Sequence, residues 1–310
     1  MFLSCGDALY DVFQTQNPTP TQTHLTAQIG GSPLNVALGL ARLGQPVAFL
    51  CANSTDTFGE KIQQFLVSEQ IDTQHVVRTD KNTSLAMVSV NEQGHPSYAF
   101  YIEGSADVSL TASDMPDPNQ FSAISLGSYT TVVQPVAGAL QALVAQAGPD
   151  TLIAYDPNVR PSIQPDPQVW WDAFDVLAKR ADLIKLSDED VEFLSPGASL
   201  EDFAAKALSY GPKWVVITRG GEGARVFGSQ GQRIDCPGHA IKVADTVGAG
   251  DTFQAAMLDA LQRHGWLSPQ TIAQADMAQV VDWAIRAAAV TCTRVGADLP
   301  RFNDVQGFQG

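Results

Sequence analysis

Seven residues near the C-terminal end, Asp245-Thr246-Val247-Gly248-Ala249-Gly250-Asp251, combine a glycine-rich turn with a carboxylate. They join a short β-like run at 240–243 to a strongly helical pattern at 249–264. Glycines allow close approach of a ligand to the backbone, and free N–H groups at a helix start attract anions. Asp251 would repel a phosphate, but it can serve as a base beside one. This pairing suits transfer of a phosphoryl group to an alcohol.

The same motif also has a purely structural explanation. An aspartate near a helix N-terminus can cap the helix or complement its dipole, and glycine-rich turns before helices are common. Taken alone, the heptapeptide leaves both interpretations open. The chain has no G-x-x-x-x-G-K-[ST] loop, which excludes a P-loop enzyme, and no G-x-G-x-x-G, which disfavours a dinucleotide-binding fold.

The apolar pattern indicates which elements position these residues. Short apolar runs lie at 47–52, 123–126, 152–155, 183–185 and 214–218. Helical patterns lie at 33–43, 58–69, 249–264 and 270–293. Their alternation predicts a mostly parallel sheet covered by helices on both faces. The segments 10–28 and 83–100 break the alternation and predict extra hairpin-like strands, with 84–90 and 97–101 paired around a turn at 91–96.

Length and charge restrict the classes of function. A chain of 310 residues with 45% hydrophobic residues is long enough for one large domain with a substantial core. The net charge of −15 repels nucleic acid and anionic membranes, so we expect small-molecule partners. The four cysteines are widely spaced, and no secretory leader or membrane-spanning run is evident. We therefore expect free thiols and a cytoplasmic protein.

Several ordered motifs together resemble the ribokinase-like sugar kinases, the phosphofructokinase B family. The heptapeptide resembles the family signature D-T-x-G-A-G-D, and residues 30–37 resemble G-G-x-x-x-N-x-A. Residues 156–161 resemble the D-P-N-x-R-P segment of the fructokinase branch. Matching segments at 185–190 and 218–224 extend the resemblance over about 6–300. It implies a ribokinase-like three-layer α/β fold with a mostly parallel central sheet and a small β-sheet lid. We expect one domain over 1–310, with lid strands inserted at about 10–29 and 83–107.

The resemblance also implies roles for individual residues. ATP would phosphorylate a sugar primary hydroxyl, with Asp251 as base and the N–H groups of Gly248, Ala249 and Gly250 as anion hole. The residues expected at the sugar are Asp11, Gly30, Gly31, Asn35, Tyr101, Arg160 and Asp251. Those expected at the nucleotide are Lys185, Ser187, Thr218, Gly220, Gly221 and Gly223.

Two cations accompany ATP in the resembled family. Magnesium is tied to an N-x-x-E pattern, for which this chain has Ser187 and Asp190, so Asp190 is the expected Mg²⁺-linked residue. A monovalent cation such as K⁺ would lie beside the anion hole at Asp245, the Val247 carbonyl and Gly296.

The lid segment 100–107 resembles F-Y-x-x-x-x-A-D of fructokinases. Relatives acting on 2-keto-3-deoxygluconate carry an arginine where this chain has Ile102, which favours a neutral ketohexose and fructose 6-phosphate as product. Arg160 keeps the acid sugar open as an alternative. A kinase of another sugar or of a nucleoside, and a non-catalytic sugar-sensing protein, are further alternatives. The resemblance also suggests a homodimer formed through the lid strands.

Overall fold

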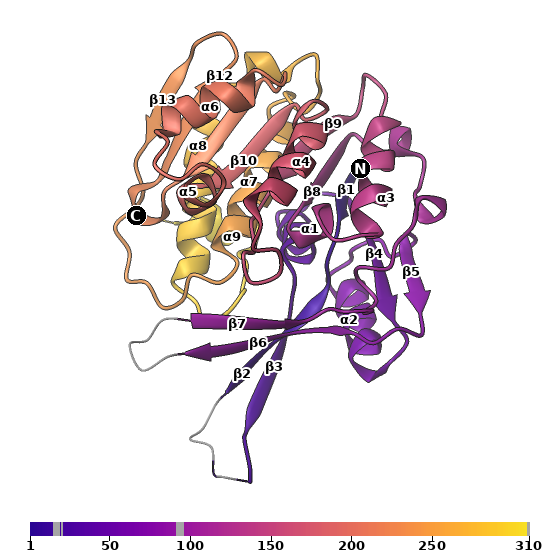
Figure 1. Ribbon diagram of the computed structural model, residues 1–310. Coiled ribbons are helices and arrows are strands. Elements are labelled where there is room, and N and C mark those ends of the chain that lie inside the picture. The colour runs from indigo at the N-terminus through magenta and orange to yellow at the C-terminus, as the bar shows by residue number, and fades with distance from the viewer. Residues whose placement is uncertain (15–18, 20, 91–95, 309–310) are drawn as a thin grey trace.

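The computed structural model describes residues 1–14, 19, 21–90 and 96–308 of the chain. Within these residues the backbone forms a nine-stranded sheet and a separate four-stranded sheet. Figure 1 shows the smaller sheet extending from one end of a body in which helices surround the larger sheet. No helix in the described part of the chain is both long and apolar enough to cross a membrane.

The large sheet has the order β13-β12-β11-β10-β9-β8-β1-β4-β5. Neighbouring strands from β11 to β5 run parallel, whereas β12 and β13 form an antiparallel edge. Its strands are β1 Phe2–Cys5, β4 Val47–Ser54, β5 Val76–Thr79, β8 Ala123–Gly127, β9 Leu152–Asp156, β10 Leu183–Ser187, β11 Trp214–Thr218, β12 Ala224–Gly228 and β13 Arg233–Cys236. The sequence therefore predicted a mostly parallel sheet correctly.

The four-stranded sheet, here called the lid, has the order β3-β2-β6-β7. Its strands are β2 Leu9–Gln14, β3 Leu25–Gly30, β6 Ser84–Val90 and β7 Pro96–Tyr101. The predicted pairing of 84–90 with 97–101 is confirmed, because β6 and β7 are antiparallel partners. Residues 91–95 of the predicted turn lie outside the described residues.

Helices cover both faces of the large sheet, which gives three layers. The helices are α1 Ser32–Arg42, α2 Thr57–Ser68, α3 Val136–Ala145, α4 Pro167–Ala178, α5 Asp188–Leu194, α6 Leu200–Leu208, α7 Ala249–Arg263, α8 Met277–Cys292 and α9 Phe302–Gln306. Apolar residues of α1, α7 and α8 pack in one core, and those of α3, α4 and α6 in the other. Neighbouring β1 residues alternate between the two, since Phe2 lies in the first core and Leu3 in the second.

Helix α7 begins and ends close to its predicted limits of 249 and 264. Gly248 caps it with φ of 79°, a left-handed conformation that favours glycine. The β-like run predicted at 240–243 is wrong, because this segment has no regular secondary structure. Strand β13 ends at Cys236, and Pro237 lacks the N–H that would continue the ladder.

The last predicted helix starts later than its apolar pattern indicates. The pattern covers 270–293, but α8 begins at Met277, and Asp276 caps it by accepting a hydrogen bond from the Gln279 N–H. A short 3-10 helix, Ile272–Gln274, precedes it.

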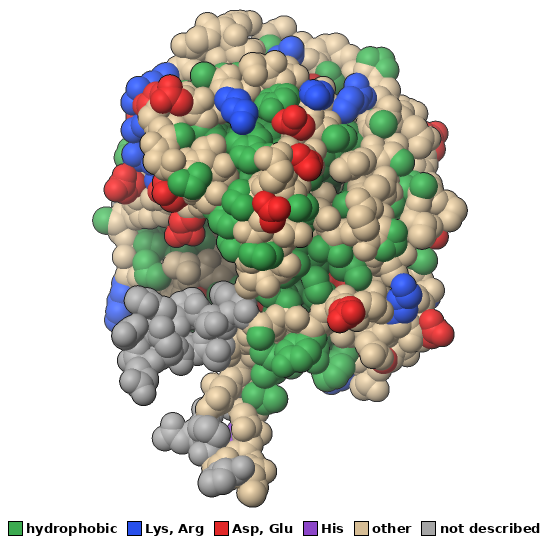
Figure 2. Space-filling model, in the orientation of Figure 1, with side chains coloured by type: hydrophobic (Ala, Val, Ile, Leu, Met, Phe, Trp, Pro, Cys, Tyr) green, Lys and Arg blue, Asp and Glu red, His purple; other side chains and the backbone are tan. Residues whose placement is uncertain are grey.

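The parallel strands end at the edge of the large sheet that faces the lid, and Figure 2 shows a recess between body and lid on the face drawn. In open α/β sheets this carboxyl edge is where ligands bind. The fold therefore directs attention to the residues just beyond these strand ends.

Candidate active site

A cavity of ≈ 690 Å³ lies at the carboxyl edge of the large sheet, with lid residues in its wall. The five central strands of the sheet, β1, β8, β9, β10 and β11, each contribute a residue at or just beyond their carboxyl ends. These residues are Asp7 after β1, Ser128 after β8, Asn158 after β9, Ser187 of β10 and Thr218 of β11. The cavity also receives the first turns of α1 and α7, which brings residues more than 200 positions apart into one site.

Asp251 lies at the centre of a hydrogen-bond network between α1 and α7. Ser32 Oγ donates to its Oδ1 at 2.7 Å, and Asn35 Nδ2 donates to its Oδ2 at 2.8 Å. Asn158 Nδ2 donates in turn to Ser32 Oγ at 2.6 Å. Asp251 is only 8% exposed but lines the cavity, so these donors fix the carboxylate while leaving it accessible to a ligand.

Two local features of the backbone make this network possible. Gly39 of α1 packs so closely on α7 that a Cβ at Gly39 would stand 2.6 Å from the Ala255 Cβ. Asn158 has φ of 42°, in the left-handed region that asparagine tolerates better than most residues. The close helix packing and the strained turn together carry Asn35 and Asn158 to the carboxylate.

The amides at the start of α7 form the candidate anion hole. Gly248 and Gly250 line the cavity. The Ala249 N–H already donates to the Thr246 carbonyl at 3.2 Å, and Ala249 is not part of the cavity wall. In the described part of the chain, the N–H groups of Gly248, Gly250 and Asp251 have no backbone or side-chain acceptor. The available donors therefore differ by one residue from the predicted set.

A buried ion pair lies beneath this helix start. Lys185 Nζ donates to Asp156 Oδ2 at 2.6 Å, and both side chains are almost fully buried. The ammonium is also 3.4 Å from the position that a Cβ on Gly250 would take. Burial raises the pKa of Asp156 to about 6, although the Lys185 charge opposes that rise. Lys185 therefore places a positive charge next to the candidate anion hole, where negative charge would develop.

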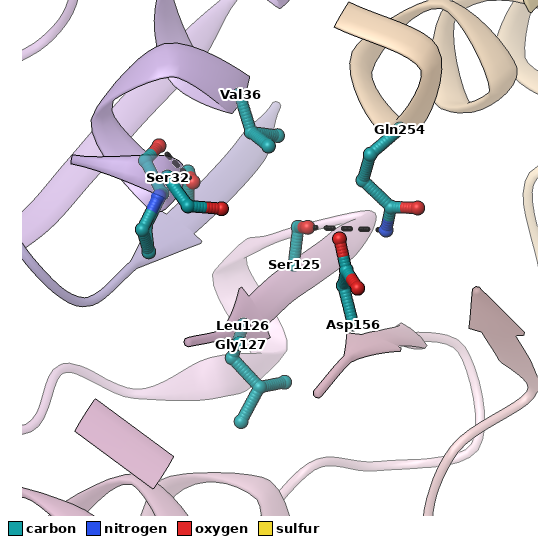
Figure 3. A pocket seen from close by; sticks show the side chains of 9 residues that line it. Ser32, Val36, Ser125, Leu126, Gly127, Asp156 and Gln254 are labelled. Atoms are coloured by element: carbon teal, nitrogen blue, oxygen red, sulfur yellow. Dashed lines mark hydrogen bonds between the residues drawn. The ribbon is translucent and has the colours of Figure 1, made fainter. Parts of the chain in front are cut away.

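A second, small space beside the ion pair contains hydrogen-bond acceptors that have no partner in the described residues. Figure 3 shows Asp156, Ser125 and Gln254 pointing toward one another in a small space of ≈ 10 Å³. Gln254 Nε2 donates to Ser125 Oγ at 3.4 Å. Asp156 Oδ1 and Gln254 Oε1 are buried without a hydrogen-bond partner in the described residues. Unpaired buried acceptors are costly, which is more typical of a functional site than of a core.

The residues predicted for sugar binding lie mostly together at the lid side of the cavity. Asp11, Gly31, Asn35 and Arg160 all line it. Burial raises the pKa of Asp11 to about 6, and Arg160 opposes this rise. Gly30 is not in the wall, but a Cβ there would stand 2.3 Å from Asp11 Oδ2. Gly30 therefore leaves room for the Asp11 carboxylate.

Tyr101 does not occupy the place predicted for it. Its side chain is 64% exposed and is absent from the cavity wall, whereas Phe100 lines the cavity. Successive residues of a strand point to opposite faces, so only one of this pair can face the site. Of this pair, Phe100 is therefore the residue that faces the cavity.

The predicted nucleotide residues divide into two groups. Lys185, Ser187, Thr218 and Gly220 line the cavity. Gly221 and Gly223 do not line it. Gly223 instead closes a turn with φ of 92°, and a Cβ there would stand 2.1 Å from the Cys236 carbonyl oxygen. Close backbone packing therefore explains why a glycine is required at position 223.

Asp190 positions its neighbours through both of its oxygens. Oδ1 accepts from the Val159 N–H at 2.8 Å, and Oδ2 accepts from the Ser187 N–H and Oγ, each at 2.8 Å. These bonds cap α5 and tie it to the segment after β9. Asp188 and Glu189 also line the cavity and are more exposed, so their carboxylates are the ones available to a ligand.

The three residues predicted for a monovalent cation lie together. The Val247 N–H donates to Asp245 Oδ1 at 3.1 Å, and the Gly296 N–H donates to Oδ2 at 2.9 Å. The carboxylate thereby joins the loop before α7 to the loop after α8.

The cavity also contains residues that were not predicted as site residues. They are Asp7, Leu9, Ser32, Phe100, Ser128, Tyr129, Asn158, Val159, Pro161, Asp188, Glu189, Phe193 and Thr246. Asp7 and Asn158 could have been found, because each is a polar residue two positions after the end of a buried strand. Ser128 has φ of 63°, a left-handed conformation that the sequence does not reveal.

Comparison with known proteins identifies the family to which the sequence and the fold are similar. Residues 2–303 match the model of the family described as pfkB family carbohydrate kinase. A fructokinase of Rhizobium leguminosarum bv. trifolii is 32% identical over 89% of this chain and 84% of its own length. A Vibrio cholerae O395 fructokinase structure, in fructose, ADP and calcium ion bound form, is 30% identical, with a TM-score of 0.84 over 100% of this chain and 98% of that one. A Xylella fastidiosa fructokinase with bound ATP shares the fold, with a TM-score of 0.88 at 22% identity over 98% and 96% of the two chains.

Proposed function

Since the chain belongs to the pfkB family of carbohydrate kinases, we propose that it transfers the γ-phosphoryl group of ATP to fructose, yielding fructose 6-phosphate. Membership of the family makes it an ATP-dependent sugar kinase with a ribokinase-like fold. The observation that carries the proposed mechanism is the position of Asp251, which two donors hold in the cavity wall at the start of α7.

In this mechanism Asp251 takes the proton of the sugar primary hydroxyl as the new P–O bond forms. The bond between the γ-phosphorus and the β–γ bridging oxygen breaks, and ADP leaves with the electron pair. The free amides at the start of α7 stabilise the charge on the transferring group, and the nearby Lys185 ammonium adds to this field. Fixed donors act most strongly where charge develops, so this arrangement favours the transition state over bound ATP.

The residues present fit both expected cations. Magnesium binds proteins through one or two carboxylates together with substrate phosphates, and Asp188 and Glu189 offer carboxylates in the cavity wall. Asp190, whose oxygens already accept three hydrogen bonds, would position this segment. Asp245, whose two oxygens already accept the Val247 and Gly296 N–H groups, and the Val247 carbonyl would offer oxygen donors to K⁺. Both ions would lower the charge repulsion between ATP and this acidic protein.

The choice of fructose rests on the curated relatives and on Ile102, which stands where acid-sugar kinases carry an arginine. Ile102 packs on the hydrophobic core and brings no charge to the lid. The second candidate substrate is 2-keto-3-deoxygluconate, because the Arg160 guanidinium lines the cavity and could pair with a carboxylate. Arg160 donates to the carbonyls of Asn158 and Val159, which holds its side chain at the sugar end.

A substrate panel tests the proposed function. ADP release would be measured with Mg-ATP and fructose, ribose, 2-keto-3-deoxygluconate, adenosine, inosine or no sugar. Turnover largely confined to fructose supports the proposal. A higher kcat/KM with the keto acid would replace fructose by the acid sugar, and binding of a sugar without turnover would favour a sensing protein.

We also propose a homodimer formed through the lid. Strand β3 is an edge of the lid sheet, and Leu25 to Gln28 along it are exposed, with Leu25 at 50%. An exposed edge strand with an apolar side chain can pair with a second copy. Light scattering of the wild type and of Leu25→Lys tests this. A dimer lost in the variant supports the proposal, and a monomeric wild type contradicts it.

A further inference from the structure

Asp7 is a buried carboxylate in the wall of the cavity. It follows β1, is 1% exposed and lines the sugar side of the site. Its Oδ2 accepts from the Ser32 N–H at 3.1 Å. Its Oδ1 is buried and has no hydrogen-bond partner in the described part of the chain. One oxygen therefore caps α1, and the other is left for something that the protein does not supply.

A second buried carboxylate, Asp107, differs from Asp7 in its hydrogen-bond partners. Asp107 is also fully buried, but it accepts hydrogen bonds from Ser84, Ser105 and Tyr129 and is not in the cavity wall. Its role in joining lid and body is explained by those contacts. Burial raises the pKa of Asp7 to about 7, and the charge of Asp107 raises it further while Arg160 opposes the rise. Ionised Asp7 thus costs stability, and hydrogen bonding by the Ser128 side chain and by its own backbone offsets only part of that cost.

The location of Asp7 relative to the base is fixed by one residue. Ser32 donates its N–H to Asp7 and its Oγ to Asp251, so the two carboxylates lie on either side of a single residue. A sugar with its primary hydroxyl at Asp251 would have other hydroxyls within reach of Asp7. Hydroxyl groups are the donors that a free carboxylate oxygen requires.

We propose that Asp7 is a sugar-binding and specificity-determining residue, whose free Oδ1 accepts a hydrogen bond from a secondary hydroxyl of a neutral sugar. This inference rests on the proposed function of the same site. Together with Asp11, an ionised Asp7 offsets the Arg160 charge in that part of the cavity, which disfavours a sugar that carries a carboxylate.

The first test is Asp7→Asn, which keeps the size of the side chain and an acceptor for the Ser32 N–H. The KM for fructose should rise at least about tenfold, because a hydrogen bond to a charged group is lost, while the KM for ATP stays within about twofold. The ratio of kcat/KM for 2-keto-3-deoxygluconate to that for fructose should rise. The free energy of unfolding at pH 8 should not fall, since a buried charge is removed. A merely structural Asp7 would give the reverse, lower stability with an unchanged fructose KM.

Asp182→Asn is the matched control. Burial also raises the pKa of Asp182, but this residue precedes β10 at the opposite edge of the sheet, where it accepts from the Ile153 N–H. Its replacement should leave both KM values unchanged. An equal rise of the fructose KM in both variants would overturn the proposal.

Deoxyfructoses lacking one secondary hydroxyl identify the contact. For one of them the wild type and Asp7→Asn should have similar KM values, because the partner of Oδ1 is already absent. An undiminished effect of Asp7→Asn on every deoxy sugar would overturn the proposal. If the variant does not fold, a crystal structure of the wild type with fructose decides. A sugar oxygen about 3 Å from Oδ1 supports the contact, and none within hydrogen-bond distance contradicts it.

The failure of this inference can be distinguished from failure of the proposed function. If the wild type prefers another neutral sugar, the same variants are measured with that sugar. A raised KM for that sugar in Asp7→Asn but not in Asp182→Asn then supports the inference, and equal KM values in both variants contradict it. If the wild type prefers the acid sugar, the fructose assignment and the specificity role of Asp7 are both wrong.

Discussion

Asn35 Nδ2 donates a hydrogen bond to Asp251 Oδ2 at 2.8 Å, which joins the first turn of α1 to the first turn of α7. The two residues are 216 positions apart, and Asn35 is 5% exposed. The amide thereby orients the carboxylate that we propose as the base. In the family motifs these two residues belong to different signatures, and the contact explains why both are needed at one site.

Replacing Asn35 with Leu should therefore lower kcat by about 10- to 100-fold, because Asp251 loses one of the two donors that orient it. The KM for ATP should change little. Asn53→Leu is the control, since Asn53 is equally buried but donates to the Gly59 carbonyl, away from the cavity. Both variants should lose about 1–3 kcal/mol of unfolding free energy. Equal kcat values for the two variants would show that the contact does not support catalysis.

Much of the site could be predicted from the sequence, because its residues lie in short motifs whose spacing is local. The glycine turn and helix of 248–263, the two-residue glycine start of α1, and Asp11 are of this kind. Tyr101 was misplaced because the phase of a strand, which decides whether Phe100 or Tyr101 faces the site, depends on lid pairing. The unpaired oxygen of Asp7 and the left-handed Ser128 depend on tertiary packing, which no local pattern reveals.

Gly30→Ala should weaken sugar binding by displacing Asp11, because the new Cβ would stand 2.3 Å from Asp11 Oδ2. We expect the fructose KM to rise about tenfold, with kcat and the KM for ATP much less affected. Gly138→Ala is the control: Gly138 lies in the first turn of α3, where a Cβ would meet only the flexible end of Gln134, so both KM values should stay unchanged. Steady-state kinetics with each substrate varied would separate these effects, and an unchanged fructose KM in Gly30→Ala would remove Asp11 from the sugar site.

For the buried Lys185–Asp156 ion pair, we predict that removing one partner destabilises the protein much more than replacing both partners. Asp156→Asn should cost about 3–5 kcal/mol of unfolding free energy, since it leaves the buried Lys185 charge unpaired. The double variant Asp156→Asn with Lys185→Met should recover much of that loss. Urea unfolding of the wild type, both single variants and the double variant gives the coupling energy. Additive losses would contradict a directly coupled pair.

Stability should fall as pH rises from about 4 to about 7 in the absence of ligands. The folded-state pKa values of Asp7 and Asp11 are raised to about 7 and about 6, above the ordinary value of 3.8. In this window the folded protein binds more protons than the unfolded chain, so raising the pH removes stability. Urea unfolding at pH 5, 6, 7 and 8 measures the slope, which should be smaller in Asp7→Asn. A slope of the opposite sign would contradict these pKa shifts.

Below pH 4 the trend should reverse. Hydrogen bonds from the Gly59 and Thr83 N–H groups lower the pKa of Asp56 to about 2, against the effect of burial. Its contribution is present above about pH 4 and is lost as pH falls toward 2. Asp56→Ala should therefore be less stable than the wild type at pH 6, with a smaller difference near pH 2. An undiminished difference at pH 2 would contradict this assignment.

The most direct test of the central claim is the turnover of fructose by the wild type and by Asp251→Asn with Mg-ATP, alongside a titration of ATP binding. We predict rapid ADP release by the wild type, a fall in kcat of several orders of magnitude in the variant, and nearly unchanged ATP affinity, because the base acts only in the chemical step. A variant with wild-type turnover would contradict the role of Asp251 and the mechanism built on it.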